Sequence, residues 1–169
     1  MPENKELRDY RILHFDDEPA NIRGLREVIF DNLCNIYPGL DDTSGARRIL
    51  PDNAGMVITV AQAGFLLTYL VANTEEKFDE LVAAVPAPQR CVLILDLMRA
   101  GDKNLELVGN VLYKKYKQKP FVGMFFLTAY ESKVYPEIVA EIGKANIWPK
   151  PPTTSAFINE VISRLSPWK

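Results

Sequence analysis

The feature that most constrains the fold is the stretch of residues 91–105, CVLILDLMRAGDKNL. Its first five residues are apolar without alternation, which is typical of a strand buried on both faces of a parallel sheet. The run ends at Asp96, and a turn-like segment follows before a helical pattern opens at Leu105. Asp96 is therefore expected at the carboxyl end of a buried strand, where open α/β sheets place their ligand sites. Because an aspartate can also cap a helix or start a turn, this reading depends on the rest of the chain.

Apolar runs and helical patterns alternate along the remaining sequence. Strands are expected at about 10–15, 65–72, 91–95, 121–127 and 145–148, and helices at about 19–35, 74–82, 105–116, 134–142 and 154–165. Five such alternations predict a single α/β domain over 1–169, with its core at about 10–165. Its sheet would be parallel, five-stranded and doubly wound, with helices on both faces. The apolar run at 56–61 is either an added strand or one arm of a hairpin.

Composition and charge exclude several classes of protein. A net charge of −2 gives no basic surface for nucleic acid or an anionic membrane. The apolar run at 56–72 contains polar residues and is interpreted as strands rather than a membrane span. Cys34 and Cys91 have no metal-ligand spacing and indicate free thiols in a reducing compartment, the cytoplasm. The single histidine, His14, disfavours zinc and Ser-His-Asp chemistry and is expected to pack in the core.

Polar residues follow four of the expected strands. Asp16 and Asp17 come after the first strand, Asp96 after the third, Thr128 after the fourth and Lys150 after the fifth. The carboxyl ends of parallel strands lie at one edge, so these side chains should converge. Three carboxylates repel one another unless a cation lies among them, and oxygen ligands without His or Cys suit Mg²⁺. Such a cation, a hydroxyl and an ammonium around a carboxylate nucleophile form a site for a transferred phosphoryl group.

The motifs FDDEP (residues 15–19), LDLMRAG (95–101), LTAY (127–130) and WPKPP (148–152) occur in that order. Together they resemble the receiver domain of two-component response regulators, over residues 10–165. The resemblance implies a flavodoxin-like sheet with strand order 2-1-3-4-5. It implies a stand-alone phosphoacceptor in a phosphorelay, which catalyses only its own phosphorylation and dephosphorylation and signals through protein contacts.

The same resemblance implies a role for each residue of the site. Asp96 would accept the phosphoryl group from a sensor histidine kinase or a phosphotransfer protein. Thr128 and Lys150 would contact the phosphoryl oxygens, and the Lys150–Pro151 bond would be cis. The downstream protein partner is not identified by the sequence, and a homodimer is a further candidate assembly.

The resemblance also implies a Mg²⁺ site. Asp17 and Asp96 would bind the ion directly, the backbone carbonyl of Met98 would be a third protein ligand, and Asp16 would orient the metal's waters. The duller reading is that Asp16 and Asp17 merely cap the first helix. Lys150 would then be a solvated charge on a loop, and Thr128 would cap a turn.

Two departures from the family pattern stand out. The aromatic residue expected three positions before the lysine is Ile147 here, and Trp148 follows it, so the two side chains should point to opposite faces of the sheet. An insertion at about 38–64 lengthens the spacing between Asp17 and Asp96. It is expected near the end of the first helix, on the face away from the phosphorylation site, as a partner surface, a dimer element or a tolerated surface loop.

Two rival functions remain open on the sequence. One is an interaction-only pseudo-receiver that keeps the fold but is not phosphorylated, which Ile147 favours and the intact acidic, Thr and Lys set disfavours. The other is a Mg²⁺-dependent phosphatase acting through an aspartyl-phosphate. Such enzymes commonly need a second acid two residues after the nucleophile, and that position is Met98.

Overall fold

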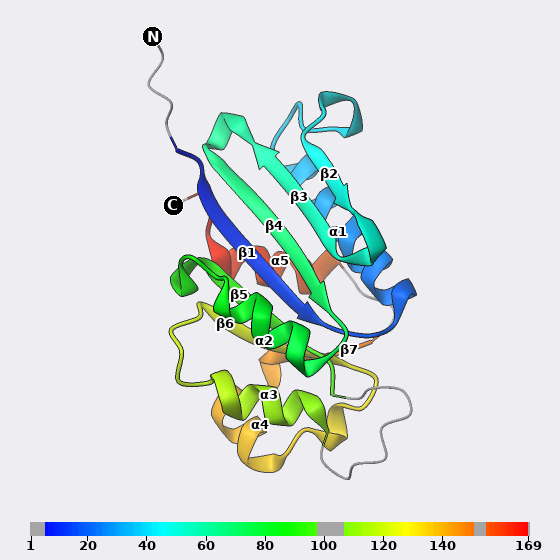
Figure 1. The fold of residues 1–169 in the computed structure, drawn as a ribbon, viewed down its shortest axis with the longest axis vertical. Helices are drawn as coiled ribbons and strands as arrows, with labels where there is room; N and C mark the ends of the chain where they lie inside the picture. Colours follow the sequence, from blue (N-terminus) through cyan, green and yellow to red (C-terminus); the bar gives the residue numbers. More distant parts are fainter. Residues whose placement is uncertain (1–5, 98–106, 151–154, 169) are drawn as a thin grey trace.

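The computed structural model describes residues 6–97, 107–150 and 155–168. Within these residues, one sheet of seven strands runs in the order β2-β3-β4-β1-β5-β6-β7 (Figure 1). The strands are β1 (Arg8–Phe15), β2 (Arg47–Leu50), β3 (Gly55–Val60), β4 (Phe65–Ala72), β5 (Cys91–Leu95), β6 (Gly123–Thr128) and β7 (Ile147–Pro149).

Five helices pack on the two faces of this sheet: α1 (Pro19–Ile36), α2 (Glu75–Ala83), α3 (Val108–Tyr116), α4 (Pro136–Ile142) and α5 (Ser155–Leu165). Pro19 begins α1, where its missing N–H costs no hydrogen bond. Thr74 caps α2 by accepting a hydrogen bond from the Lys77 N–H at 3.2 Å. None of the helices in the described part of the chain is long and apolar enough to cross a membrane.

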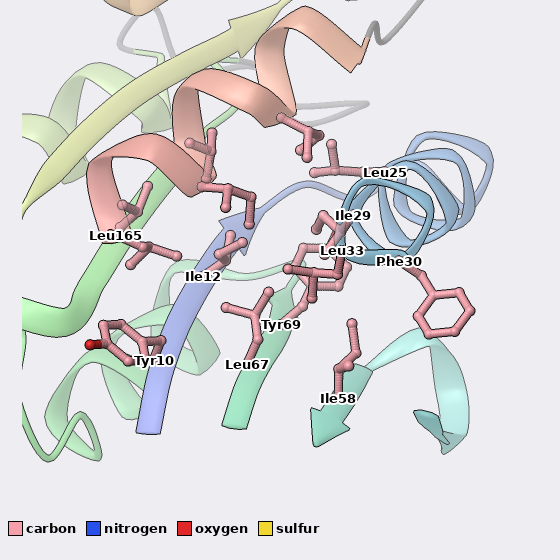
Figure 2. Packing of buried hydrophobic residues seen from close by; sticks show 14 of the residues in the cluster. Tyr10, Ile12, Leu25, Ile29, Phe30, Leu33, Ile58, Leu67, Tyr69 and Leu165 are labelled. Atoms are coloured by element: carbon pink, nitrogen blue, oxygen red, sulfur yellow. The ribbon is translucent and has the colours of Figure 1, made fainter. Parts of the chain in front are cut away.

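The helices divide between two hydrophobic cores, one on each face of the sheet. α1 and α5 cover one face, and α2, α3 and α4 cover the other (Figure 1). Leu25, Ile29 and Leu33 recur every four residues along α1 and are fully buried. Figure 2 shows Ile29 and Leu33 directed at the strand that carries Leu67. Each such side chain contributes about 1.5–3 kcal/mol by leaving water.

The prediction of a five-stranded parallel sheet was wrong, although the α/β class is confirmed. Strands β4, β1, β5, β6 and β7 pair in parallel, in that order. β3 and β2 extend the sheet beyond β4, and both of their pairings are antiparallel. β2 lies within residues 39–55, whose polar composition with scattered Gly and Pro indicates a loop or a short helix rather than a strand. All four residues of β2 are half-buried or exposed, so its side chains can be polar.

The position predicted for the inserted segment was right for its two ends and wrong for the tip of its hairpin. The two ends meet near the end of α1, where the Gln62 side chain donates to the Pro38 carbonyl at 3.2 Å. β3 runs antiparallel to β4, so the turn between β2 and β3 lies beside the carboxyl end of β4. The Val71 N–H donates to the Ala54 carbonyl at 2.9 Å there. Asp52 and Asn53 hold this turn with φ values of 58° and 54°, a left-handed conformation that Asp and Asn tolerate. The tip of the inserted hairpin therefore lies at the same edge of the sheet as the carboxylates.

Candidate functional site

The backbone of the sheet brings Asp16 and Asp96 together. Phe15 and Leu95 are register partners at the ends of β1 and β5, so the residue after each strand leaves the sheet at the same level. The Asp96 N–H continues this ladder by donating to the Phe15 carbonyl at 3.0 Å. On the other side of β1, the Asp16 N–H donates to the Ala72 carbonyl at 3.1 Å. Backbone hydrogen bonds thus fix the main chain of both aspartates, independently of any contact that their carboxylates make.

Lys150 lies between these two carboxylates. Its Nζ atom is 2.8 Å from Asp16 Oδ2 and 2.8 Å from Asp96 Oδ2, and the three side chains are almost completely buried. The Lys150 N–H donates to the Thr128 carbonyl at 2.9 Å, which fixes the lysine backbone beside β6. Burial alone would lower the pKa of Lys150, but the carboxylates of Asp16 and Asp96 outweigh it, and the pKa is raised.

Asp16 is the carboxylate with the most partners. Its Oδ1 atom accepts from the Glu18 N–H at 2.9 Å, and its Oδ2 atom faces Lys150 and, at 3.4 Å, the Nε2 atom of His14. Burial by itself opposes ionisation of Asp16. The contact with His14 and the ammonium of Lys150 more than offset burial and lower the pKa of Asp16 to about 2.

The pKa of Asp96 is shifted in the opposite direction to that of Asp16. Burial raises the pKa of Asp96 above its ordinary value, and the hydrogen bond and charge of Lys150 offset only part of this rise. Asp96 therefore takes its negative charge less readily than Asp16, although both contact the same ammonium. Two neighbouring carboxylates with opposite pKa shifts are typical of sites that separate a permanent charge from a reactive group.

The three predicted acidic ligands lie together. Asp16, Asp17 and Asp96 each offer a carboxylate oxygen, and these oxygens lie within 4.8 Å of one another. Asp17 is partly exposed and borders a hollow of about 240 Å³, which Asp52 and Lys77 also line. A set of hard oxygen donors fits a cation such as Mg²⁺, although it does not select one metal.

Thr128 is fully buried at the end of β6. Its Oγ1 atom accepts a hydrogen bond from the Tyr130 N–H at 3.0 Å, so the hydroxyl holds the turn that follows the strand. The backbone of Thr128 contacts Lys150, as described above. Two further predictions, the Met98 carbonyl as a ligand and a cis Lys150–Pro151 bond, concern Met98 and Pro151, which lie outside the described residues.

The two residues at the departure from the family pattern lie on opposite sides of the sheet. Trp148 packs against Phe157 of α5, with ring centroids 5.4 Å apart. Ile147 faces the α4 side and, with Val134 and Val139, lines a hollow of about 510 Å³. The aromatic residue is thus not available on the α4 side of β7, as the one-residue shift predicts.

Sequence reasoning missed two residues of the site. Gly109, in the first turn of α3, lies so close to the backbone after β5 that a Cβ atom there would be 2.4 Å from the Asp96 carbonyl oxygen. His14 was assigned to the core, and it is indeed fully buried, but it faces Asp16. The signal for His14 was its spacing, because residues two apart on a strand share a face. The sequence around Gly109 gave no signal, since the need for a glycine depends on how closely α3 packs against the backbone of Asp96.

No protein-family model matches this chain, and a search of the curated proteins finds no match either. Function is therefore inferred from the side chains of the site and the strands that hold them.

Proposed function

We propose that this chain is a phosphoacceptor signalling domain of the receiver type, which takes a phosphoryl group on Asp96 in a Mg²⁺-dependent reaction. One observation carries the proposal. The buried ammonium of Lys150 contacts both Asp96 and Asp16, at the sheet edge where Asp17 and Thr128 also lie. A lysine in that position can follow charge added to Asp96 without leaving the site.

The order of the parallel strands supports the same proposal. Taken in chain order, the five parallel strands follow the pattern 2-1-3-4-5, which is that of flavodoxin-like sheets. Asp16 and Asp96 follow neighbouring strands at the point where that order reverses. The β2–β3 hairpin is an addition to this arrangement on the far side of β4.

Each side chain has a defined task in the proposed reaction. An oxygen of Asp96 forms a bond to phosphorus while the bond from phosphorus to the donor breaks, and the electron pair leaves with the donor. Lys150 offsets the charge of the phosphoryl oxygens. Thr128 has a hydroxyl proton to donate to one of those oxygens, and turning toward that oxygen would take Oγ1 away from the Tyr130 N–H.

The acidic residues would hold the metal ion. Asp17 and Asp96 are the proposed direct ligands, together with the carbonyl of Met98. Asp16 would act through metal-bound water, because its two oxygens already face Glu18, His14 and Lys150. When bound, Mg²⁺ would offset negative charge on the transferred phosphoryl group.

The proposed output is a change beside α4. If Thr128 turns toward a phosphoryl group, the Tyr130 N–H loses its acceptor, and the turn that leads to α4 is released from β6. Since Ile147 replaces an aromatic residue there, we expect the readout to use this turn rather than an aromatic switch. The proposed donor is a sensor histidine kinase or a phosphotransfer protein in the cytoplasm, and the output is protein contact.

The test is the intact mass of the protein after incubation with acetyl phosphate, with and without Mg²⁺. We expect one phosphoryl adduct that requires Mg²⁺ and is absent from Asp96→Asn. Asp31→Asn is the matched control, because it makes the same change at an exposed position of α1. An adduct on Asp96→Asn, or none on the wild type, contradicts the proposal.

The second candidate is a pseudo-receiver that binds partners without being phosphorylated. It is favoured by the ion pairs of Lys150, which balance part of the charge of Asp16 and Asp96 without a metal ion. A wild type that forms no adduct and shows no heat of Mg²⁺ binding by calorimetry would support this candidate.

A further inference from the structure

A buried chain of polar groups runs from the core to the site. Tyr69 of β4 and His14 of β1 are both fully buried, on neighbouring strands. The Tyr69 hydroxyl oxygen lies 2.7 Å from His14 Nδ1. The other ring nitrogen of His14, Nε2, lies 3.4 Å from Asp16 Oδ2. Buried polar side chains cost free energy unless they are paired, so this arrangement calls for a structural or functional reason.

The tautomer of His14 follows from its two neighbours. Burial raises the pKa of Tyr69 well above its ordinary value, and the charge of Asp16 raises it further, so Tyr69 keeps its hydroxyl proton. A buried hydroxyl proton needs an acceptor, and the Tyr69 hydroxyl lies within hydrogen-bond distance of His14 Nδ1. Nδ1 therefore accepts and carries no proton. With the Tyr69 hydroxyl donating to Nδ1, the ring N–H of His14 lies on Nε2, the nitrogen that is 3.4 Å from Asp16 Oδ2.

His14 and Lys150 compete for the same oxygen of Asp16. The lysine contact is 2.8 Å and the histidine contact is 3.4 Å, and neither has the alignment of a hydrogen bond. Lys150 is thus the nearer partner while Asp96 is unmodified. When Lys150 turns to a phosphoryl group on Asp96, Oδ2 of Asp16 keeps His14 as its neighbouring donor.

We propose that His14, with its tautomer set by Tyr69, is the positioning residue for Asp16. It holds the Asp16 carboxylate toward the metal's waters when Lys150 moves to the phosphoryl group. This inference rests on the proposed function. Groups that orient the ligands of a metal site typically change metal affinity or activity by about 10–100-fold when they are removed.

The first test is the ring ¹⁵N spectrum of His14, which is unambiguous because the chain has a single histidine. We expect the Nε2-protonated tautomer in the wild type. We also expect the signals to approach the mixture typical of a free imidazole in Tyr69→Phe, since the donor to Nδ1 is then absent. An Nδ1-protonated ring in the wild type would overturn the proposal, and this readout needs neither metal nor phosphodonor.

The second test compares function in a variant that avoids an unpaired phenol. The double variant His14→Phe, Tyr69→Phe removes both polar partners together, so the core keeps its aromatic volume. We expect its Mg²⁺ dissociation constant to rise about tenfold and phosphorylation by acetyl phosphate to slow by a similar factor. His14→Gln, which keeps a donor near Asp16, should recover part of both losses.

Tyr37→Phe is the matched control, because Tyr37 is a tyrosine whose buried hydroxyl has no hydrogen-bond partner among the described residues. It should leave both readouts unchanged. Unchanged Mg²⁺ affinity and rate in the His14 double variant, beside a wild type that forms the adduct, overturn the His14 proposal alone. A wild type that forms no adduct overturns the proposed function and the role of His14 with it.

Discussion

The Nζ atom of Lys150 lies 2.8 Å from Asp96 Oδ2, and the same ammonium lies 2.8 Å from Asp16 Oδ2. One buried cation thus serves two buried carboxylates that come from strands far apart in the sequence. The sheet alone brings Asp16 and Asp96 together, and without Lys150 they would face each other as like charges. The lysine is therefore a structural counter-ion and, in the proposed function, the residue that would respond to a phosphoryl group on Asp96.

Replacing Lys150 with an uncharged residue should destabilise the protein. In Lys150→Met, both carboxylates lose their shared counter-charge, and we expect the free energy of unfolding to fall by roughly 3–5 kcal/mol in urea denaturation. Adding Asp96→Asn to Lys150→Met should restore part of the loss, because one buried charge is removed. A double variant no more stable than Lys150→Met would contradict the shared-cation picture.

Neutralising Asp96 alone should have the opposite effect. Burial raises the pKa of Asp96 in the folded state. At pH values above this raised pKa, which include neutral pH, the ionised carboxylate therefore lowers the free energy of unfolding. Asp96→Asn should therefore raise the melting temperature at pH 7, by about 2–4 °C for each kcal/mol gained. At a pH low enough to protonate Asp96, the difference should disappear. A lower melting temperature at pH 7 would contradict the expected sign.

Asp16 should make the protein sensitive to acid. Its pKa is lowered to about 2 in the folded state from an ordinary value of 3.8, so it contributes stability above pH 3.8 that is lost as the pH falls toward 2. A shift of this size corresponds to about 2 kcal/mol. The free energy of unfolding should fall less steeply between pH 4 and 2 in Asp16→Asn than in the wild type. Asp31→Asn should keep the wild-type slope.

The contact of Gly109 with the Asp96 backbone can be tested with a second helical glycine as the control. A Cβ at Gly109 would meet the backbone of Asp96 and Leu97, which follow β5, so Gly109→Ala should displace α3 from this segment and cost about 1–3 kcal/mol. It should also slow phosphorylation of Asp96. A Cβ at Gly24 of α1 meets nothing within 4 Å, and Gly24→Ala should stabilise the protein by about 0.5–1 kcal/mol. Equal effects of the two substitutions would exclude a special role for Gly109.

The inserted hairpin should behave as part of the core rather than as a tolerated loop. Met56, Ile58 and Val60 of β3 are fully buried, and Figure 2 shows Ile58 directed toward α1. Ile58→Ala should cost about 2–5 kcal/mol in chemical denaturation. Ile49 of β2 is 44 % exposed, and Ile49→Ala should change stability by less than about 0.5 kcal/mol. A small effect at Ile58 would mean that the hairpin is not packed as described.

Part of this fold could be read from the sequence because the signals are local. The central strand was predicted at its observed bounds, since an unbroken apolar run has few other uses in a chain of this type. The helix after Thr74 was predicted from its capping residue, and the threonine does accept the capping hydrogen bond. The strand at 65–72 was also predicted as observed, because its apolar run is bounded by Gly64 and by that helix start.

The outer part of the sheet could not be read in the same way. Arg47 and Arg48 gave β2 the composition of a loop, and the pairing that makes it a strand is with β3, a partner whose own assignment was left open. The same distinction between local and non-local signals holds for the site. The ends of the strands predicted which acidic residues would lie together. The pairing of His14 with Tyr69 depends on the register of β1 with β4, which no local pattern encodes.

The β2–β3 hairpin also affects how this protein can self-associate. Without it, β4 would end the sheet with an eight-residue strand, Phe65–Ala72, offering a long row of free backbone groups to any other extended chain. With the hairpin present, the backbone groups of β4 are paired with β3, and the edge strand on this side of the sheet is the four-residue β2, which carries Arg47 and Arg48. A short, charged border is a poor template for strand addition. Self-association of this protein, where it occurs, is therefore expected through its helical faces.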